Sequence, residues 1–121
     1  MSEFEDVDRK FSKQAGLCGV IGTATDSSQA ATINSRYGTV TSSTTTLAAD
    51  TVETLTITCS ECKSTSIVLA NVRGGGAAAG ALSVCATPGA GSFTLGVRNN
   101  TSATAADAAY VVDYVIISSN V

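Results

Sequence analysis

The sequence predicts an all-β protein, an antiparallel β-sandwich or jelly roll with a short N-terminal arm. From residue 18 onward, apolar and polar residues alternate with a period of two, which is typical of half-buried strands. These runs are rich in threonine and β-branched residues, and short turns that contain glycine or proline separate them. The chain of 121 residues has room for one domain, which we place at residues 18–121 behind an arm of residues 1–17.

The N-terminal arm concentrates charge. Within residues 3–13, four acidic residues precede three basic ones, an order that suits a short helix because acids stabilise its first turn and bases its last. Apolar residues recur there at helical spacing and would give the helix one apolar face. The arm is either a frayed terminus or a segment that becomes ordered against a partner. In the second case we expect the contacts to come from Phe4, Val7, Arg9, Lys10, Phe11 and Lys13.

Strand signals follow in order along the rest of the chain. The segments that carry them are residues 39–47, 53–59, 66–72, 82–87, 92–98 and 110–117. The alternation is clearest in two of them, where the predicted core faces comprise Leu55, Ile57 and Cys59 in one and Phe93, Leu95 and Val97 in the other. The run at 66–72 is more densely apolar, and the last segment is β-branched and aromatic.

The turns agree with this assignment. Residues 87–91 (TPGAG) lie between two alternating runs, where proline sets φ and glycine supplies positive φ. Residues 74–80 and 99–107 are loops of small side chains. No helix of ordinary length fits after residue 20, so six or seven strands should pack as two antiparallel sheets and not as alternating β and α units.

Composition excludes several classes of function. The net charge is −3 with only 7 lysines and arginines, so we expect no nucleic-acid partner, because such binding relies on basic side chains. No apolar run approaches the roughly 20 residues of a membrane helix, so we expect no membrane partner. The N-terminus is acidic where a secretory signal would be basic and then apolar, which predicts folding in a cytoplasm.

The sequence also lacks the residues that common catalytic and metal sites use. The chain has no histidine, which excludes Ser-His-Asp and Cys-His catalysis. The carboxylates after the arm show no paired spacing that the sequence alone places in one cleft. We therefore expect no enzyme and no cofactor.

The motif Cys59-Ser60-Glu61-Cys62 has three interpretations. A zinc site needs four cysteine or histidine ligands, usually as two close pairs, and the second pair is missing. A thioredoxin-like redox pair needs a helix N-terminus, whereas this motif ends a strand. We expect the third, a strand end and turn, in which Cys59 is a small buried residue in phase with Ile57. A disulfide formed after cell lysis remains a minor alternative.

Asp113 is a charged residue within the apolar last strand. If its face is part of the core, it needs a partner such as Arg73 or Arg98. If the strand is an edge, the charge discourages stray strand pairing. A third possibility is an ion pair between subunits near an oligomer axis.

Three segments resemble a β-module of tailed-bacteriophage virion proteins. They are TLTIT (residues 54–58) with TSIVLANV (65–72), TPGAGSFTLGVRN (87–99), and the apolar strand 110–117. The similarity spans roughly residues 38–118, and it departs from the module at residues 59–62, where small polar residues are expected. The module occurs in capsid decoration (cement) proteins and in the heads of tail fibres.

The resemblance implies a homotrimer of jelly-roll or sandwich domains that belongs to a virion assembled in the host cytoplasm. As a cement protein, its trimers would bridge subunits of the major capsid protein, and the arm would bind a neighbouring subunit. The alternative is a tail-fibre head, or a small tail or baseplate protein, whose loops at residues 74–80 and 99–107 bind a host receptor. A third class is a non-viral adhesin or carbohydrate-binding module. The short chain favours the cement protein, because a fibre head normally follows a long shaft.

Overall fold

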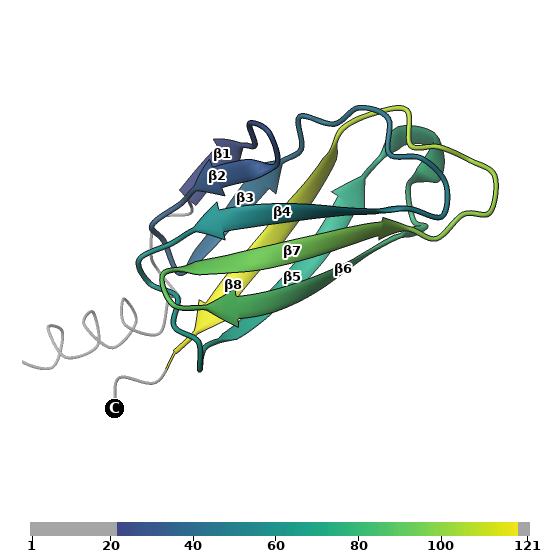
Figure 1. Ribbon diagram of the computed structural model, residues 1–121. Coiled ribbons are helices and arrows are strands. Elements are labelled where there is room, and N and C mark those ends of the chain that lie inside the picture. The colour runs from purple at the N-terminus through teal and green to yellow at the C-terminus, as the bar shows by residue number, and fades with distance from the viewer. Residues whose placement is uncertain (1–21, 119–121) are drawn as a thin grey trace, which may run out of the picture.

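The computed structural model describes residues 22–118, and these form two four-stranded sheets that pack face to face (Figure 1). Sheet A has the order β1-β3-β8-β5 and sheet B the order β2-β4-β7-β6. The all-β prediction and its sandwich architecture are confirmed. The elements are β1 (Gly22–Thr25), β2 (Ala30–Thr32), β3 (Tyr37–Thr41), β4 (Val52–Thr58), β5 (Ile67–Gly74), η1 (a 3-10 helix, Gly76–Ala78), β6 (Leu82–Gly89), β7 (Ser92–Asn99) and β8 (Tyr110–Ile117).

The predicted arm of residues 1–17 lies outside the described residues. So do the contact residues predicted for it, Phe4, Val7, Arg9, Lys10, Phe11 and Lys13.

The expectation of wholly antiparallel sheets is wrong at one side of the sandwich. The pairs β3–β8, β5–β8, β4–β7 and β6–β7 are antiparallel, but β1 pairs with β3, and β2 with β4, in parallel. The reason is the path of the chain, because the first four strands alternate between sheet A and sheet B. Strands two apart in the sequence therefore run in the same direction and become neighbours in one sheet.

The core lies between the two sheets, and the predicted alternation is confirmed there. The predicted faces of β4 and β7 are buried, with Leu55, Ile57, Cys59, Phe93, Leu95 and Val97 at most 1% exposed. From sheet A, β8 contributes Tyr110, Val112, Tyr114 and Ile116. The rings of Phe93 and Tyr114 meet across the two layers with centroids 4.7 Å apart.

One predicted strand is shorter than expected. The threonine-rich run at residues 39–47 is extended only as far as Thr41. The side chain of Ser42 then accepts a hydrogen bond from the backbone N–H of Thr44, and that of Asp26 accepts one from Ser43. Because these side chains take the place of a neighbouring strand, the backbone leaves the sheet. The turn between β6 and β7 is also tighter than predicted, and consists of Ala90 and Gly91, with a positive φ of 76° at Gly91.

Asn99, at the end of β7, joins the loop between β3 and β4 to the loop between β7 and β8. Its fully buried amide donates to the carbonyls of Leu47 and Thr104 at 3.1 and 2.9 Å. Its side-chain oxygen accepts from the backbone N–H of Thr101 at 3.0 Å. This end of the sandwich is therefore held by a polar side chain inside the fold.

Candidate functional site

The outer face of sheet A carries apolar side chains at one end. Ile67 pairs with Ile117, and Leu69 pairs with Val115, across β5 and β8. Ile67, Leu69 and Ile117 are 57%, 54% and 51% exposed, so three of the four exposed large hydrophobic residues within residues 22–118 lie in this group. We call Ile67, Leu69, Val115 and Ile117 the apolar end. A patch of this kind on a small domain is typical of a surface that contacts another protein segment.

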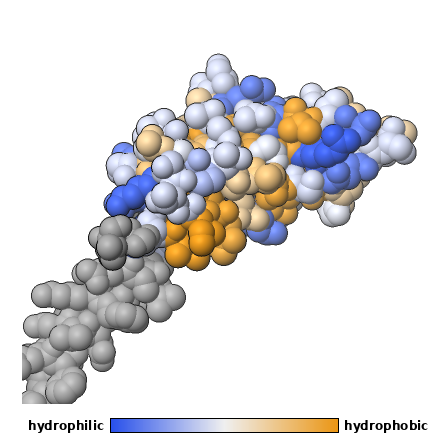
Figure 2. Space-filling model, turned by 60° about the horizontal axis from the view of Figure 1, so that its bottom comes forward, coloured by the Kyte–Doolittle hydropathy of each residue, from blue (hydrophilic) through white to orange (hydrophobic). Residues whose placement is uncertain are grey.

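The space-filling view shows how hydrophobic and polar residues are distributed over the surface. Figure 2 shows hydrophobic surface gathered over one end of the sandwich, while the opposite end is mostly polar. An open depression of about 350 Å³ lies beside the apolar end and is lined by Leu69, Ala70, Asn71, Asp113, Tyr114 and Val115. The surface is thus slightly hollowed where its character changes from apolar to charged.

Asp113 marks that change, and its partner lies in the same chain. Its Oδ2 is 2.9 Å from Nε of Arg73, and its Oδ1 accepts from the hydroxyl of Thr39 at 2.9 Å. The hydrogen bond from Arg73 is the main cause that lowers the pKa of Asp113 from its usual value. Of the two partners named for a core position of Asp113, Arg73 does pair with it, whereas Arg98 pairs with Asp50.

The structure also decides which face Asp113 occupies. Asp113 lies on the outer face of sheet A, since the neighbouring residues Val112 and Tyr114 are the buried ones. The core interpretation is therefore wrong. The edge interpretation is wrong as well, because β8 lies between β3 and β5.

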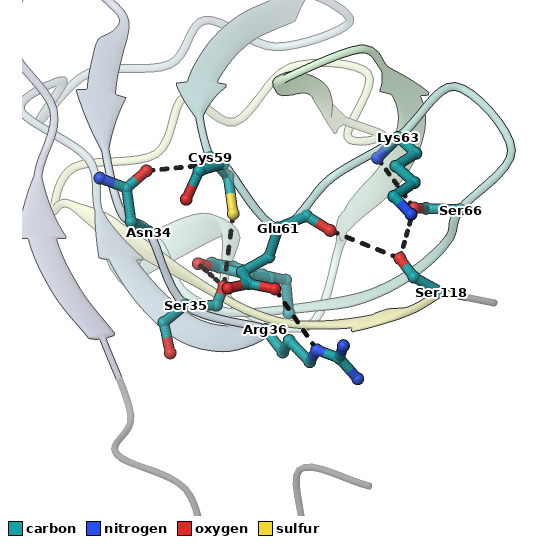
Figure 3. A network of polar contacts seen from close by, with 10 residues as sticks. Asn34, Ser35, Arg36, Cys59, Glu61, Lys63, Ser66 and Ser118 are labelled. Carbon is teal, nitrogen blue, oxygen red and sulfur yellow. Dashed lines mark hydrogen bonds and ion pairs between the residues drawn. The ribbon is translucent and has the colours of Figure 1, made fainter. Parts of the chain in front are cut away.

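A polar network holds the apolar end in place (Figure 3). Ser66 precedes Ile67 and Ser118 follows Ile117, and their hydroxyl oxygens are 2.6 Å apart. Ser118 also donates to the carbonyl of Glu61 at 3.4 Å. The ends of β5 and β8 are thus joined by side chains as well as by the sheet, which keeps the four apolar residues in a defined arrangement.

The Cys59–Cys62 motif forms the turn beside this network. The backbone N–H of Cys62 donates to the carbonyl of Cys59 at 3.2 Å, and both cysteines are free thiols that are at most 2% exposed. Burial is the largest cause that raises the pKa of the Cys59 thiol. The turn is further tied to the preceding loop by the Ser60 N–H, which donates to Asn34, and by an ion pair between Arg36 and Glu61. The strand-end interpretation is confirmed, and this turn supports the apolar end.

A group of buried polar side chains occupies the other end of the core. Tyr110 donates its hydroxyl proton to Glu53, which also accepts from Thr44 at 2.5 Å. Burial and this hydrogen bond raise the pKa of Tyr110, and the charge of Asp26 adds to the effect. Asp26, Glu53 and Tyr110 are 4%, 8% and 0% exposed, so this group lies inside the fold. Their role is to fix the loop that follows β3 against sheet B.

Neither the apolar end nor the buried polar group around Glu53 and Tyr110 was predicted from the sequence. The dense apolar run at residues 66–72 was a signal for the apolar end. A strand with one solvent-exposed face normally carries polar residues there, whereas this strand carries Ile67 and Leu69. The pairing of Glu53 with Tyr110 joins residues 57 apart and left no local signal.

Comparison with known proteins finds no family model, curated protein or solved structure that matches this chain. Among residues 22–118, no three cysteine, histidine or acidic side chains are grouped so that they could hold a metal ion. No helix in the same range combines the length and hydropathy needed to cross a bilayer.

Proposed function

We propose that the chain is a structural protein of a bacteriophage virion, and specifically a capsid decoration (cement) protein. The single observation that carries the proposal is the apolar end, an exposed hydrophobic surface on a well-ordered sheet. Such a surface fits stable contact with another protein subunit. The sequence resemblance to virion modules suggests that the other subunit belongs to a phage particle. The proposal requires neither a catalytic step nor a cofactor.

The mechanism is mechanical. Jelly-roll subunits associate as homotrimers over junctions between subunits of the major capsid protein, and the arm of residues 1–17 adds contacts to a neighbour. Each contact buries apolar area worth about 25 cal/mol per Å². Because the contacts recur over the whole shell, they raise the free energy needed to separate capsid subunits under the pressure of packaged DNA.

A tail-fibre head or baseplate protein is the second candidate, and one observation favours it. The loops at residues 74–80 and 99–107 lie together at the end of the sandwich opposite the apolar end (Figure 1). Asp107 joins them by accepting a 2.7 Å hydrogen bond from the backbone N–H of Ala77. Two joined, exposed loops at one tip of a subunit fit the geometry of receptor contact.

Particle fractionation distinguishes the two functions. Labelled protein is mixed with purified phage heads that lack it and with purified tails, and each is sedimented. We expect the wild type to bind heads, Leu69→Ser to bind them more weakly, and Val52→Ser to bind as the wild type does. Val52 is the matched control because it is also 54% exposed but lies on sheet B. Binding to tails only, with none to heads, would overturn the cement proposal.

A further inference from the structure

The first residue of β1 and the apolar end lie toward the same end of sheet A, measured along the strands. Gly22, the first residue of β1, pairs with Gly38, which pairs with Tyr114, which pairs with Ala70. Gly22 therefore lies in the same transverse row as Ala70, the neighbour of Leu69. Three strand spacings separate the two ends of this row, roughly 14 Å in total.

The direction of β1 determines where the preceding chain starts. From Gly22 to Thr25 the strand runs toward the row of Val111 and Arg73, away from the apolar end. The backbone nitrogen of Gly22 therefore lies at the end of β1 that is closer to the apolar end. Lys13 and Gly22 are nine Cα–Cα steps apart, and nine steps reach about 30 Å when the chain is extended. A segment that ends at Lys13 can thus be placed over the apolar end of its own subunit.

The arm also matches the apolar end in chemistry and size. Helical spacing puts Phe4, Val7 and Phe11 on one face, over about 10 Å of helix. The apolar end consists of two rows of side chains about 7 Å apart along the strands. Two to three turns of an amphipathic helix cover such a surface, and both sides lose exposed apolar area.

We propose that, in the free subunit, the arm folds back and its residues 3–13 form an amphipathic helix whose Phe4, Val7 and Phe11 cover the apolar end of the same chain. The occupant of this surface before assembly is thus the chain's own arm. Intramolecular docking is favoured over docking to a second copy because the short connection keeps the arm at high effective concentration. A subunit that joins a larger assembly would then exchange this contact for one with a neighbour.

Methyl NMR of the full-length chain tests the proposal. Phe4→Ser combined with Phe11→Ser should shift the methyl resonances of Ile67, Leu69, Val115 and Ile117 and leave those of Val52 in place. The control Asp6→Ser, on the opposite face of the predicted helix, should shift none of them. Unmoved resonances at the apolar end in the double variant would overturn the proposal. So would shifts that depend on protein concentration, because they would show that a second copy supplies the arm.

Limited proteolysis is an independent test, which measures how well the arm is protected when the apolar end is altered. In Leu69→Ser, we expect trypsin to cleave after Arg9, Lys10 and Lys13 several times faster than in the wild type. Val52→Ser should be cleaved at the wild-type rate. Equal rates for all three proteins would contradict the proposal. Both experiments use the isolated protein, so they can fail while binding to phage heads succeeds, and the reverse also holds.

Discussion

Arg73 on β5 reaches diagonally across to Asp113 on β8, with its Nε 2.9 Å from one carboxylate oxygen and its Nη2 3.3 Å from the other. Both side chains are exposed to solvent, at 60% and 39%. Exposed ion pairs contribute little to folding stability. The pair lies directly beside the apolar end, because Asp113 precedes Val115 by two residues on the outer face of β8.

Asp113→Asn should alter the acid dependence of stability. The pKa of Asp113 in the folded protein is below its usual value of 3.8, so its contribution is present above that value and is lost as the pH falls below it. Urea unfolding of the wild type and the variant should therefore differ slightly at neutral pH and converge in acid. The difference should also shrink in high salt, which screens exposed charges. A difference that is constant from neutral pH into strong acid would contradict the assignment.

Tyr110→Phe should destabilise the protein more than Tyr114→Phe. Tyr110 donates to the buried carboxylate of Glu53, whereas Tyr114 donates to the backbone carbonyl of Ser35 at 3.1 Å. Loss of a hydrogen bond to a charged group costs about 1.5–3 kcal/mol, and loss of a neutral one about 0.5–1.5 kcal/mol. Denaturant unfolding measures both free energies of unfolding. The reverse order would contradict the hydrogen bond from Tyr110 to Glu53.

Asn99→Asp should be strongly destabilising. The substitution replaces an amide that donates to two carbonyls with a carboxylate that faces the same carbonyls inside the fold. A buried polar group left without its partner costs about 1–3 kcal/mol, and more when it is charged. Asn100→Asp is the matched control, because the Asn100 side chain is exposed and donates to Ala81 and Ser83. Thermal unfolding should separate the two variants clearly, and equal melting temperatures would refute the role of Asn99.

Phe93→Ala should cost about 3–5 kcal/mol of folding free energy, because it removes a buried ring from the centre of the core. Phe93 is 1% exposed and contacts Tyr114 of the opposite sheet. Val52→Ala, at an exposed position of the same sheet, should change stability much less. Urea titrations followed by circular dichroism provide the comparison. An unchanged midpoint for Phe93→Ala would mean that the buried and outer faces of β7 are reversed.

The parts of the fold that follow from local alternation could be predicted from the sequence. The buried faces of β4 and β7 repeat every second residue, and β8 begins and ends where its β-branched run does. The short strands β1 and β2 could not be predicted, because their pairing depends on a path that alternates between the sheets. The end of β3 was missed because it depends on side chains of Asp26 and Ser42 that replace sheet partners.

The candidate site was harder to predict for a similar reason. Residues 66–72 give an apolar run, but only the pairing of β5 with β8 brings Ile67 and Leu69 next to Ile117 and Val115. The sequence offered Arg73 or Arg98 as examples of a partner for Asp113 in a core position, and only the strand register shows that Arg73 reaches it on the outer face. The arm residues lie outside the described part of the chain and remain a prediction.

The edge strands differ in length between the two sides of the sandwich, so the two sides differ in how readily a further strand can pair with them. One flank ends in β1 and β2, which have four and three residues, and the other in β5 and β6, which have eight each. An incoming polypeptide that adds to a sheet by main-chain hydrogen bonds needs a long free border, and short borders resist such addition. Any polymerisation through added strands should therefore proceed from the edges formed by β5 and β6 alone. The short edge strands β1 and β2 should not accept a further strand.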